Sequence, residues 1–295
     1  MKKPLVTIGI PFYNPGDLIK VAIRSVFAQT LDNWELILID DGSTDRSEEL
    51  VRMIKSEKVR VLCDRNNLGL PARLNQIASE AKGKYLARMD ADDIMHPKRL
   101  EKQVIYLEQH PDIDLLGTRS WILDEFGRVR GKANNISTEL KIIEVLKRGG
   151  IIHPTLMASR EWFLKNPYIS CYPRAEDREL ILRVLRRYRI ICMPENLFYY
   201  RFNRRINLYN FIQGYSSERK LLIKYGRQYI SNFMTLRLYL RSCLKSFNLP
   251  LMVWLNKGER LIKRNYSDVT EQEQKTAENI IKRIKEYNVP GWQDM

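Results

Sequence analysis

The chain has 295 residues, 44% of them hydrophobic, which is enough for one large α/β domain or for one domain with a helical appendage. Its four cysteines lie far apart and have neither zinc-site nor disulfide-framework spacing, which indicates reduced thiols. The N-terminal apolar run stops at Pro11, which fits a first strand better than a signal peptide. These features exclude a disulfide-stapled exported domain and predict a cytoplasmic globular protein.

The net charge is +15, and much of it is concentrated in one region. From Arg201 to Pro250 there are ten Lys or Arg residues and a single acid, Glu218. Such a region attracts polyanions, and composition alone does not choose among nucleic acid, an anionic membrane surface and a diphosphate-bearing substrate.

The first part of the chain alternates between strand and helix patterns. Short apolar or β-branched runs predict strands at Leu5 to Ile10, Glu35 to Ile39, Val59 to Cys63 and Lys84 to Met89. Helix-period stretches lie between them at Asp17 to Gln29, Asp45 to Lys55 and Pro71 to Ala81. This order implies a mostly parallel sheet covered by helices, in which ligands bind beyond the carboxyl ends of the strands.

The later elements are expected as follows: a helix at Pro97 to Gln109, strands within Asp112 to Arg130, a helix starting near Ser137, a helix at Asp177 to Tyr188, and strands at Arg189 to Met193 and Leu197 to Arg201. Beyond about Asn207 the pattern is helical to the end. We therefore expect a first domain at 1–204 and a basic helical region at 205–295.

Carboxylates gather after two of the expected strands. Asp90-Ala91-Asp92-Asp93 places three carboxylates in four residues directly after an apolar run, a density that is costly without a counter-ion and suits Mg²⁺ or Mn²⁺. The alternative is a solvated acidic loop. Asp40 and Asp41 precede Gly42 and a helix start, which fits a turn and cap as well as a ligand site. Glu176-Asp177 opens a helix, where acids are ordinary partners of the helix dipole.

Taken together, these pieces resemble the family 2 inverting glycosyltransferases, whose α/β fold is called GT-A. The residues that carry the resemblance cover about the first 200 positions: Pro11-Phe12-Tyr13-Asn14, Asp40 to Asp45, Asn67 to Asn75, Asp90 to Asp93, His153-Pro154-Thr155 and Glu176-Asp177.

The resemblance implies a role for each matching residue. The nucleotide-binding residues would be Pro11, Tyr13, Asn14, Asp41, Asn67, Arg73, Asp90 and Arg201. Asp92 would hold a Mn²⁺ or Mg²⁺ ion that bridges the diphosphate, Asp177 would be the general base, and Glu176 would lie on the acceptor side. One displacement on the face opposite the diphosphate would invert the configuration of the sugar.

Two histidine positions limit the resemblance. Many relatives have Tyr-Arg-x-His after the base-bearing helix, with the histidine near the metal or diphosphate, but here the stretch is Tyr200-Arg201-Phe202-Asn203. Metal dependence is therefore less secure than the fold. His153 precedes a proline, which favours a turn residue ahead of a strand over a ligand.

The C-terminal region contains an apolar stripe beside a basic one. Phe233, Leu236, Leu240, Leu244 and Phe247 recur at three- or four-residue spacing, and Arg237, Arg241 and Lys245 accompany them, with Trp254 nearby. This pattern fits a helix lying on an anionic membrane, and it also fits a helix that packs on the catalytic domain or on a second copy of the chain.

We expect an enzyme that moves a sugar, UDP-linked in our interpretation, to a hydroxyl of a surface polysaccharide or lipid-linked glycan at the cytoplasmic face of the membrane. A nucleotidyltransferase is the first alternative, but Pro11 to Gly16 is not the Gly-rich phosphate loop it would need. A non-catalytic nucleic-acid- or membrane-binding protein is the second. The basic region lacks a recognisable nucleic-acid-binding signature, so no nucleic-acid partner is expected.

Overall fold

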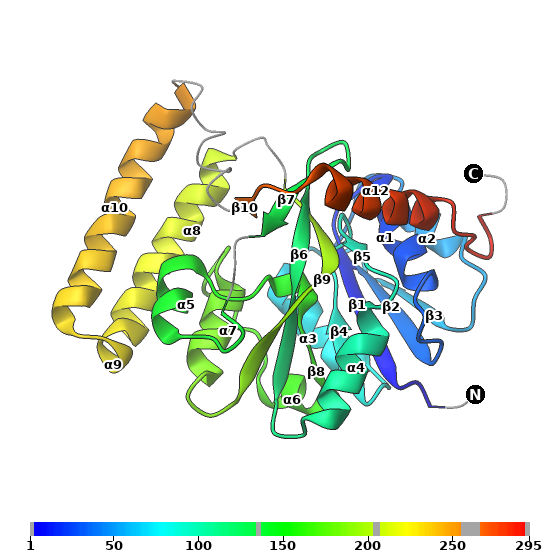
Figure 1. Cartoon of the computed structure of the whole chain (residues 1–295), viewed down its shortest axis with the longest axis horizontal. Coiled ribbons are helices and arrows are strands. Elements are labelled where there is room, and N and C mark those ends of the chain that lie inside the picture. The colour runs from blue at the N-terminus through cyan, green and yellow to red at the C-terminus, as the bar shows by residue number, and fades with distance from the viewer. Residues whose placement is uncertain (1–2, 134–136, 203–206, 255–265, 293–295) are drawn as a thin grey trace.

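The computed structural model describes residues 3–133, 137–202, 207–254 and 266–292. Its N-terminal part is a parallel sheet covered by helices (Figure 1). Its strands are β1 Val6–Phe12, β2 Trp34–Asp40, β3 Val59–Cys63 and β4 Tyr85–Arg88. The helices between them are α1 Leu18–Phe27, α2 Ser47–Arg52 and α3 Leu70–Glu80. The strand order β3-β2-β1-β4 is parallel throughout, so the expected alternation of strand and helix is confirmed.

The second half of the sheet is mixed. Its strands are β5 Ile94–Met95, β6 Leu115–Leu123, β7 Val129–Ala133, β8 Met157–Ser159, β9 Ile190–Arg201 and β10 Tyr266–Ser267. β8 is antiparallel to both β4 and β6, and β7 and β10 extend the sheet in antiparallel pairs. β6 and β9 run parallel, and β5 pairs antiparallel with β9. The expected parallel arrangement therefore describes the N-terminal half of the sheet.

The remaining helices of this part include the three that the sequence predicted and one, at Arg160–Lys165, that it did not; the helix expected to start near Ser137 begins at Ile142. They are α4 Arg99–Gln109, α5 Ile142–Arg148, a 3-10 turn at His153–Thr155, α6 Arg160–Lys165 and α7 Glu176–Val184. The two strands predicted on either side of Pro194 form one strand, β9. Shifts in its pairing with β6 near Arg119 leave Pro194 out of the ladder, where its missing N–H does no harm.

β1 is buried along its whole length and holds helices on both of its faces. Ile8 and Ile10 pack in one apolar cluster with Ile23 of α1. On the opposite face Gly9 lies under α3, where a Cβ atom would come within 2.3 Å of Cγ2 of Ile77. The glycine therefore lets α3 approach the sheet closely, and α3 is the helix that carries Arg73.

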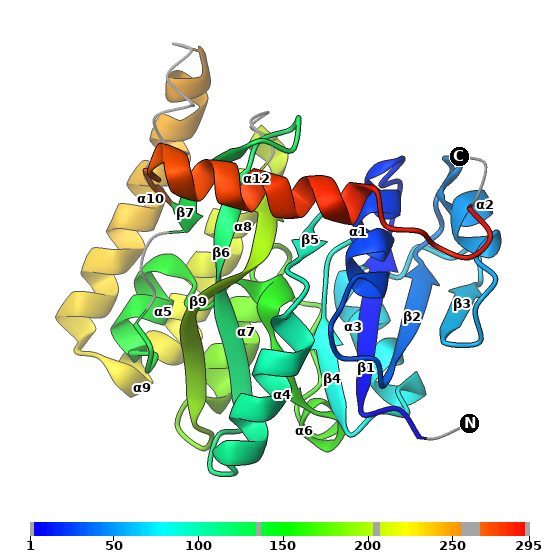
Figure 2. The same cartoon turned by 45° about the vertical axis from the view of Figure 1, so that its right-hand side comes forward.

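The C-terminal region divides into two structural parts (Figure 1). Helix α8 Leu208–Leu221 continues through a π-helical turn at Leu222–Gly226 and α9 Arg227–Tyr229, and α10 Asn232–Trp254 then packs back along α8. Helix α12 Glu271–Lys285 instead lies across the sheet and contacts α1 and β7 (Figure 2).

The end of the described chain closes over the first helices. The Trp292 side chain is buried, and its Nε1 donates a hydrogen bond to the Leu50 carbonyl oxygen at 2.9 Å. The helices expected beyond Asn207 are confirmed, whereas β10 was not predicted. The expected domain boundary at 204/205 falls on residues 203–206, outside the described residues, and stays a prediction. Of the helices the structure describes, none is long and apolar enough to cross a membrane.

Candidate active site

The carboxyl ends of β1, β2 and β4 meet at one edge of the sheet because these neighbouring strands run parallel. Phe12 at the end of β1 lies opposite Asp40 at the end of β2, and Gly9 lies opposite Arg88 at the end of β4. The loops that follow carry Tyr13, Asp41 and Asp90. The edge therefore gathers three of the predicted nucleotide-binding residues, as expected for ligand sites in such sheets.

Asp41 is fully engaged with the loop that precedes α3. Its carboxylate accepts hydrogen bonds from the backbone N–H of Leu68 at 2.8 Å and of Gly69 at 3.1 Å, and from Arg73 Nε at 2.9 Å. Arg73 is only 1% exposed, and its two terminal nitrogens bond both carboxylate oxygens of Asp64. The hydrogen bonds from Arg73 lower the pKa of Asp64 to about 2. In this structure Asp41 and Arg73 therefore fix the shape of the β3–α3 loop, which also carries the exposed Asn67.

Asn14 plays a similar role on the other side of this edge. Its Oδ1 accepts from the backbone N–H of Thr44 at 2.7 Å, and its own N–H donates to Ser43 Oγ at 3.0 Å. Its φ of 50° is rare for a side-chain-bearing residue and is tolerated best by Asn and Asp. Pro11 is buried within β1, whereas Tyr13 is 54% exposed. Of these residues, Tyr13 presents an aromatic ring to the solvent.

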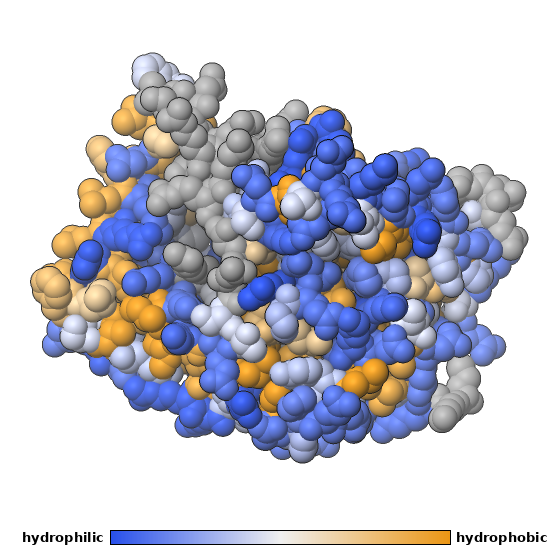
Figure 3. Space-filling model, viewed as in Figure 1, coloured by the Kyte–Doolittle hydropathy of each residue, from blue (hydrophilic) through white to orange (hydrophobic). Residues whose placement is uncertain are grey.

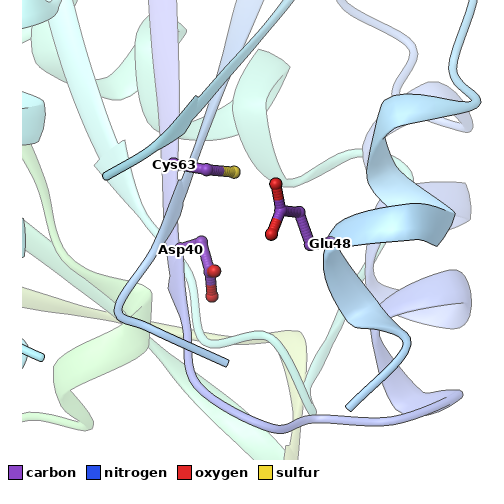
Figure 4. Close-up of side chains that lie close together, drawn as sticks. All are labelled: Asp40, Glu48 and Cys63. Carbon is purple, nitrogen blue, oxygen red and sulfur yellow. The ribbon is translucent and has the colours of Figure 1, made fainter. Parts of the chain in front are cut away.

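A second carboxylate group lies beside Asp41 and is drawn in Figure 4: Asp40, Glu48 and Cys63 point toward one another. Asp40 Oδ1 accepts from the Ser43 N–H at 3.0 Å. Arg52 Nε donates to Glu48 Oε1 at 2.8 Å, and its charge also faces Asp40 and Cys63. Arg52 offsets part of the charge of this group, while the buried Asp40 Oδ2 has no hydrogen-bond partner among the described residues. Because Asp40 holds the Ser43 N–H, we interpret the group as a support for the Asp41 loop.

The acidic loop after β4 brings three carboxylates together. Asp90, Asp92 and Asp93 each place an oxygen within 4.8 Å of the others. Asp93 is 1% exposed; its Oδ1 accepts from the Arg201 N–H at 2.7 Å, while Oδ2 is buried and has no hydrogen-bond partner among the described residues. Burial and then Asp90 raise the pKa of Asp92 to about 6, and burial with Asp92 and Asp90 raises the pKa of Asp93 further.

This crowding fits a divalent cation. A hard ion would supply the charge that the three carboxylates lack and a partner for the orphaned Asp93 oxygen. Arg201 shapes the same loop from β9: its Nε donates to the Asp92 carbonyl at 2.9 Å and its Nη1 to the Asp124 carbonyl at 3.0 Å. Asn203, which replaces the histidine of many relatives, lies outside the described residues.

Glu176 and Asp177 form the first turn of α7, as predicted. Both are half-buried. Burial raises the pKa of Asp177 and is opposed by the charges of Arg178 and Arg88. Burial and the neighbouring Asp177 raise the pKa of Glu176. A carboxylate whose pKa has moved upward is a stronger base than an ordinary one and is still ionised near neutral pH if the rise is moderate.

Arg88 connects these groups, and sequence reasoning missed it. It is the last residue of β4, is 3% exposed, and donates from Nη2 to Asp90 Oδ1 at 2.7 Å. Its Nε and Nη1 are buried and have no hydrogen-bond partner within the described ranges. Its charge acts on Asp92, Glu176 and Asp177 together. The only signal in the sequence was a cation near the end of an otherwise apolar strand.

His153 is buried in the interior, where the charge of Arg88 acts on it. Its Nε2 is 2.8 Å from the Tyr168 hydroxyl oxygen, and burial lowers its pKa well below the usual value. The residue begins the 3-10 turn ahead of β8, so the expectation of a turn residue ahead of a strand is confirmed.

Comparison with protein-family models matches residues 7–181 to the model described as glycosyl transferase family 2. An uncharacterized glycosyltransferase of Methanocaldococcus jannaschii is 32% identical over 214 residues, which are 70% of this chain and 74% of that protein. Two Bacillus subtilis proteins match shorter segments. The putative glycosyltransferase EpsE is 40% identical over 43% of this chain and 47% of its own, and the putative teichuronic acid biosynthesis glycosyltransferase TuaG is 34% identical over 36% and 42%.

Solved structures share the fold. The S. aureus protein TarS 1-349, crystallised with UDP-GlcNAc, superimposes with a TM-score of 0.61 at 16% identity and covers 82% of this chain and 72% of its own. The mannosyltransferase PcManGT from Pyrobaculum calidifontis, in complex with GDP-Man and Mn²⁺, gives 0.57 at 15% identity and covers 96% and 86%. The expected α/β fold of the GT-A class is thereby confirmed.

Proposed function

Since this chain belongs to glycosyl transferase family 2 and is a glycosyltransferase, we propose that it moves a sugar from a nucleotide-sugar donor to an acceptor hydroxyl with inversion at the anomeric carbon. The observation that carries the proposal is Arg88. This buried cation donates a hydrogen bond to Asp90 of the acidic loop and its charge lowers the pKa of Asp177, which supports placing ion binding and the base in one site.

The donor would lie along the carboxyl edge of the parallel strands. Pro11, Tyr13, Asn14, Asp41, Asn67 and Arg73 shape the nucleoside end, and Tyr13 is the exposed ring on which a base can stack. UDP is our preferred nucleotide because TarS, whose fold this chain shares, was crystallised with UDP-GlcNAc. PcManGT carries GDP-Man in its structure, so the base is a matter for a donor screen.

Asp92, supported by Asp90 and Asp93, would hold Mn²⁺ or Mg²⁺, which supplies Lewis-acid stabilisation of the leaving diphosphate. Asp90 would also approach the ribose. Arg201 places a fixed positive charge beside Asp92 by holding its carbonyl oxygen, and it would add to the stabilisation of the diphosphate.

Asp177 would take the proton of the acceptor hydroxyl as the hydroxyl oxygen bonds to the anomeric carbon. The bond from that carbon to the diphosphate oxygen breaks at the same time, and the electron pair leaves with the diphosphate. Glu176, next to Asp177 on α7, would contact the acceptor. Attack from the face opposite the leaving group inverts the configuration.

The acceptor we propose is a hydroxyl of a surface polysaccharide or lipid-linked glycan, reached at the cytoplasmic face of the membrane. Support comes from the relative TuaG, which is described as a putative teichuronic acid biosynthesis glycosyltransferase. The basic and apolar stripes of the C-terminal helices support a membrane location and are considered below.

A donor screen with the Asp177→Asn variant tests this proposal. The wild-type protein should release nucleoside diphosphate from one nucleotide sugar, and transfer by the variant should fall at least 100-fold because no base accepts the hydroxyl proton. Asp32→Asn is the matched control, since that carboxylate is 97% exposed and far from the site in the fold. A variant at position 177 that transfers sugar as fast as wild type would refute the assignment of the base.

A further inference from the structure

The outer side of α10 carries a row of large apolar side chains that nothing in the described structure covers. The α10 face, as we call it, consists of Phe233, Leu236, Leu240, Leu244, Phe247 and Trp254, each between 53 and 81% exposed. At 3.6 residues per turn these six side chains fall within an arc of about 80°. Figure 3 shows apolar residues gathered along this edge of the molecule.

The opposite side of α10 is fixed to the rest of the protein. Leu238, Ser242 and Leu249 are buried, and Ser242 Oγ donates to Glu218 Oε2 of α8 at 3.2 Å. The helix therefore cannot turn its apolar row inward without breaking its packing on α8. The exposure of the α10 face is a consequence of this fixed orientation.

The charges of the chain segment that includes the α10 face have one sign. Between Arg219 and Trp254 the chain has seven Lys or Arg residues and no Asp or Glu. Arg237 and Arg241 are exposed on the flank of the apolar row. A second copy of the chain docked on this face would bring like charges together, whereas an anionic lipid surface offers both apolar depth and opposite charge.

We propose that the α10 face is a membrane-docking surface on which α10 lies flat in the headgroup region of an anionic bilayer. The helix has 23 residues and is about 35 Å long, and a half-buried helix of this length with flanking cations has the form of an interfacial anchor. This inference depends on the proposed function in one respect, which is the lipid-linked acceptor that the bilayer would carry.

The docking surface is connected to the base through a single helix. α10 packs on α8, and α8 contacts the loop that leads into α7: Ser217 Oγ donates to the Pro173 carbonyl at 2.8 Å. Glu218 of α8 also lies 3.6 Å from Arg178, the residue after Asp177. Helix α8 therefore links α10 to the loop that leads into α7. A protein docked in this way is held at the surface that carries a lipid-linked acceptor.

Co-sedimentation of the full chain with vesicles tests the proposal. We expect binding to vesicles of 70% phosphatidylcholine and 30% phosphatidylglycerol, and at least tenfold weaker binding to pure phosphatidylcholine. Leu244→Ser with Phe247→Ser should weaken binding to the anionic vesicles about 10- to 100-fold, because two anchoring side chains are lost. Arg237→Gln with Arg241→Gln should reduce binding to anionic vesicles and leave the weak neutral binding unchanged.

The matched control is Ile105→Ser with Leu164→Ser, two exposed apolar residues of α4 and α6 away from this surface, which should bind vesicles as wild type does. Wild-type protein that stays in solution with anionic vesicles would overturn the proposal. Unchanged vesicle binding by the Leu244→Ser, Phe247→Ser variant would also overturn it. A third contrary result would be light scattering that shows a dimer for wild type and a monomer for this variant. Donor hydrolysis in the absence of vesicles should be equal in all these proteins, so failure to dock is distinguishable from failure of the catalytic assignment.

Discussion

Replacing Arg88 by Met should alter the pH dependence of donor turnover as well as stability. Arg88 is 3% exposed and its charge opposes the burial that raises the pKa of Asp177. The charged groups that act on Asp177 from its surroundings are Arg178, Arg88 and the neighbouring Glu176. Removing Arg88 therefore leaves Asp177 with less stabilisation of its ionised form.

The size of the effect follows from Coulomb's law. At an effective dielectric constant of about 20, two unit charges on the order of 10 Å apart interact by about 1.7 kcal/mol. A base works in its ionised form, so turnover rises as the pH rises through its folded-state pKa. Because burial already raises that pKa and Arg88→Met removes a charge that lowers it, the acid limb of the rate profile should move to higher pH.

The assay is release of nucleoside diphosphate measured from pH 5 to 9 for wild type, Arg88→Met and Arg88→Lys. The lysine variant keeps the charge and should retain most of the wild-type profile, while both lose some stability because the bond to Asp90 changes. An unchanged acid limb in Arg88→Met, in a protein shown to be folded, would refute the electrostatic link between the acidic loop and the base.

Two further predictions concern residues that hold the fold around the site. Arg73→Lys removes the two hydrogen bonds to the Asp64 carboxylate and one hydrogen bond to Asp41. The free energy of unfolding, measured by urea titration, should fall by about 2–4 kcal/mol. A fall below about 0.5 kcal/mol would contradict the structural role of Arg73. Trp292→Ala leaves a cavity where the buried indole contacts Leu50, and the free energy of unfolding should fall by about 3–5 kcal/mol. Donor hydrolysis by the protein that remains folded should be unchanged. A variant as stable as wild type would show that the C-terminal segment does not pack over α2.

Local patterns in the sequence were sufficient for the parallel half of the fold. Each of the first four strands is a mostly apolar or β-branched run bounded by a turn residue, and the acidic groups follow the strands directly, so their meeting at one edge could be predicted from topology alone. The first turn of α7 was predicted for the same reason, because Glu176 and Asp177 stand at a visible helix start.

The remainder depends on contacts between distant segments. Nothing near Tyr266 in the sequence indicates that it pairs with Ala133, and nothing near Trp292 shows that it lies under Leu50. Arg88 was missed because a strand pattern records its position and not its burial. The roles of Asp41 and Arg73 as supports of the β3–α3 loop likewise required the hydrogen bonds, since the motif is the same whether these side chains face a ligand or the protein.

The most direct test of the account is thermal stabilisation of wild type and Asp92→Asn by UDP and other nucleoside diphosphates, with and without Mn²⁺. We expect one diphosphate at 100 times its dissociation constant to stabilise the wild-type protein by about 2.7 kcal/mol with Mn²⁺ present and much less without it. Asp92→Asn should lose the Mn²⁺-dependent part and keep the rest, because the nucleoside pocket is built by other residues. Stabilisation of the variant equal to that of wild type in Mn²⁺ would contradict the central claim that Asp92 holds the ion beside the donor diphosphate.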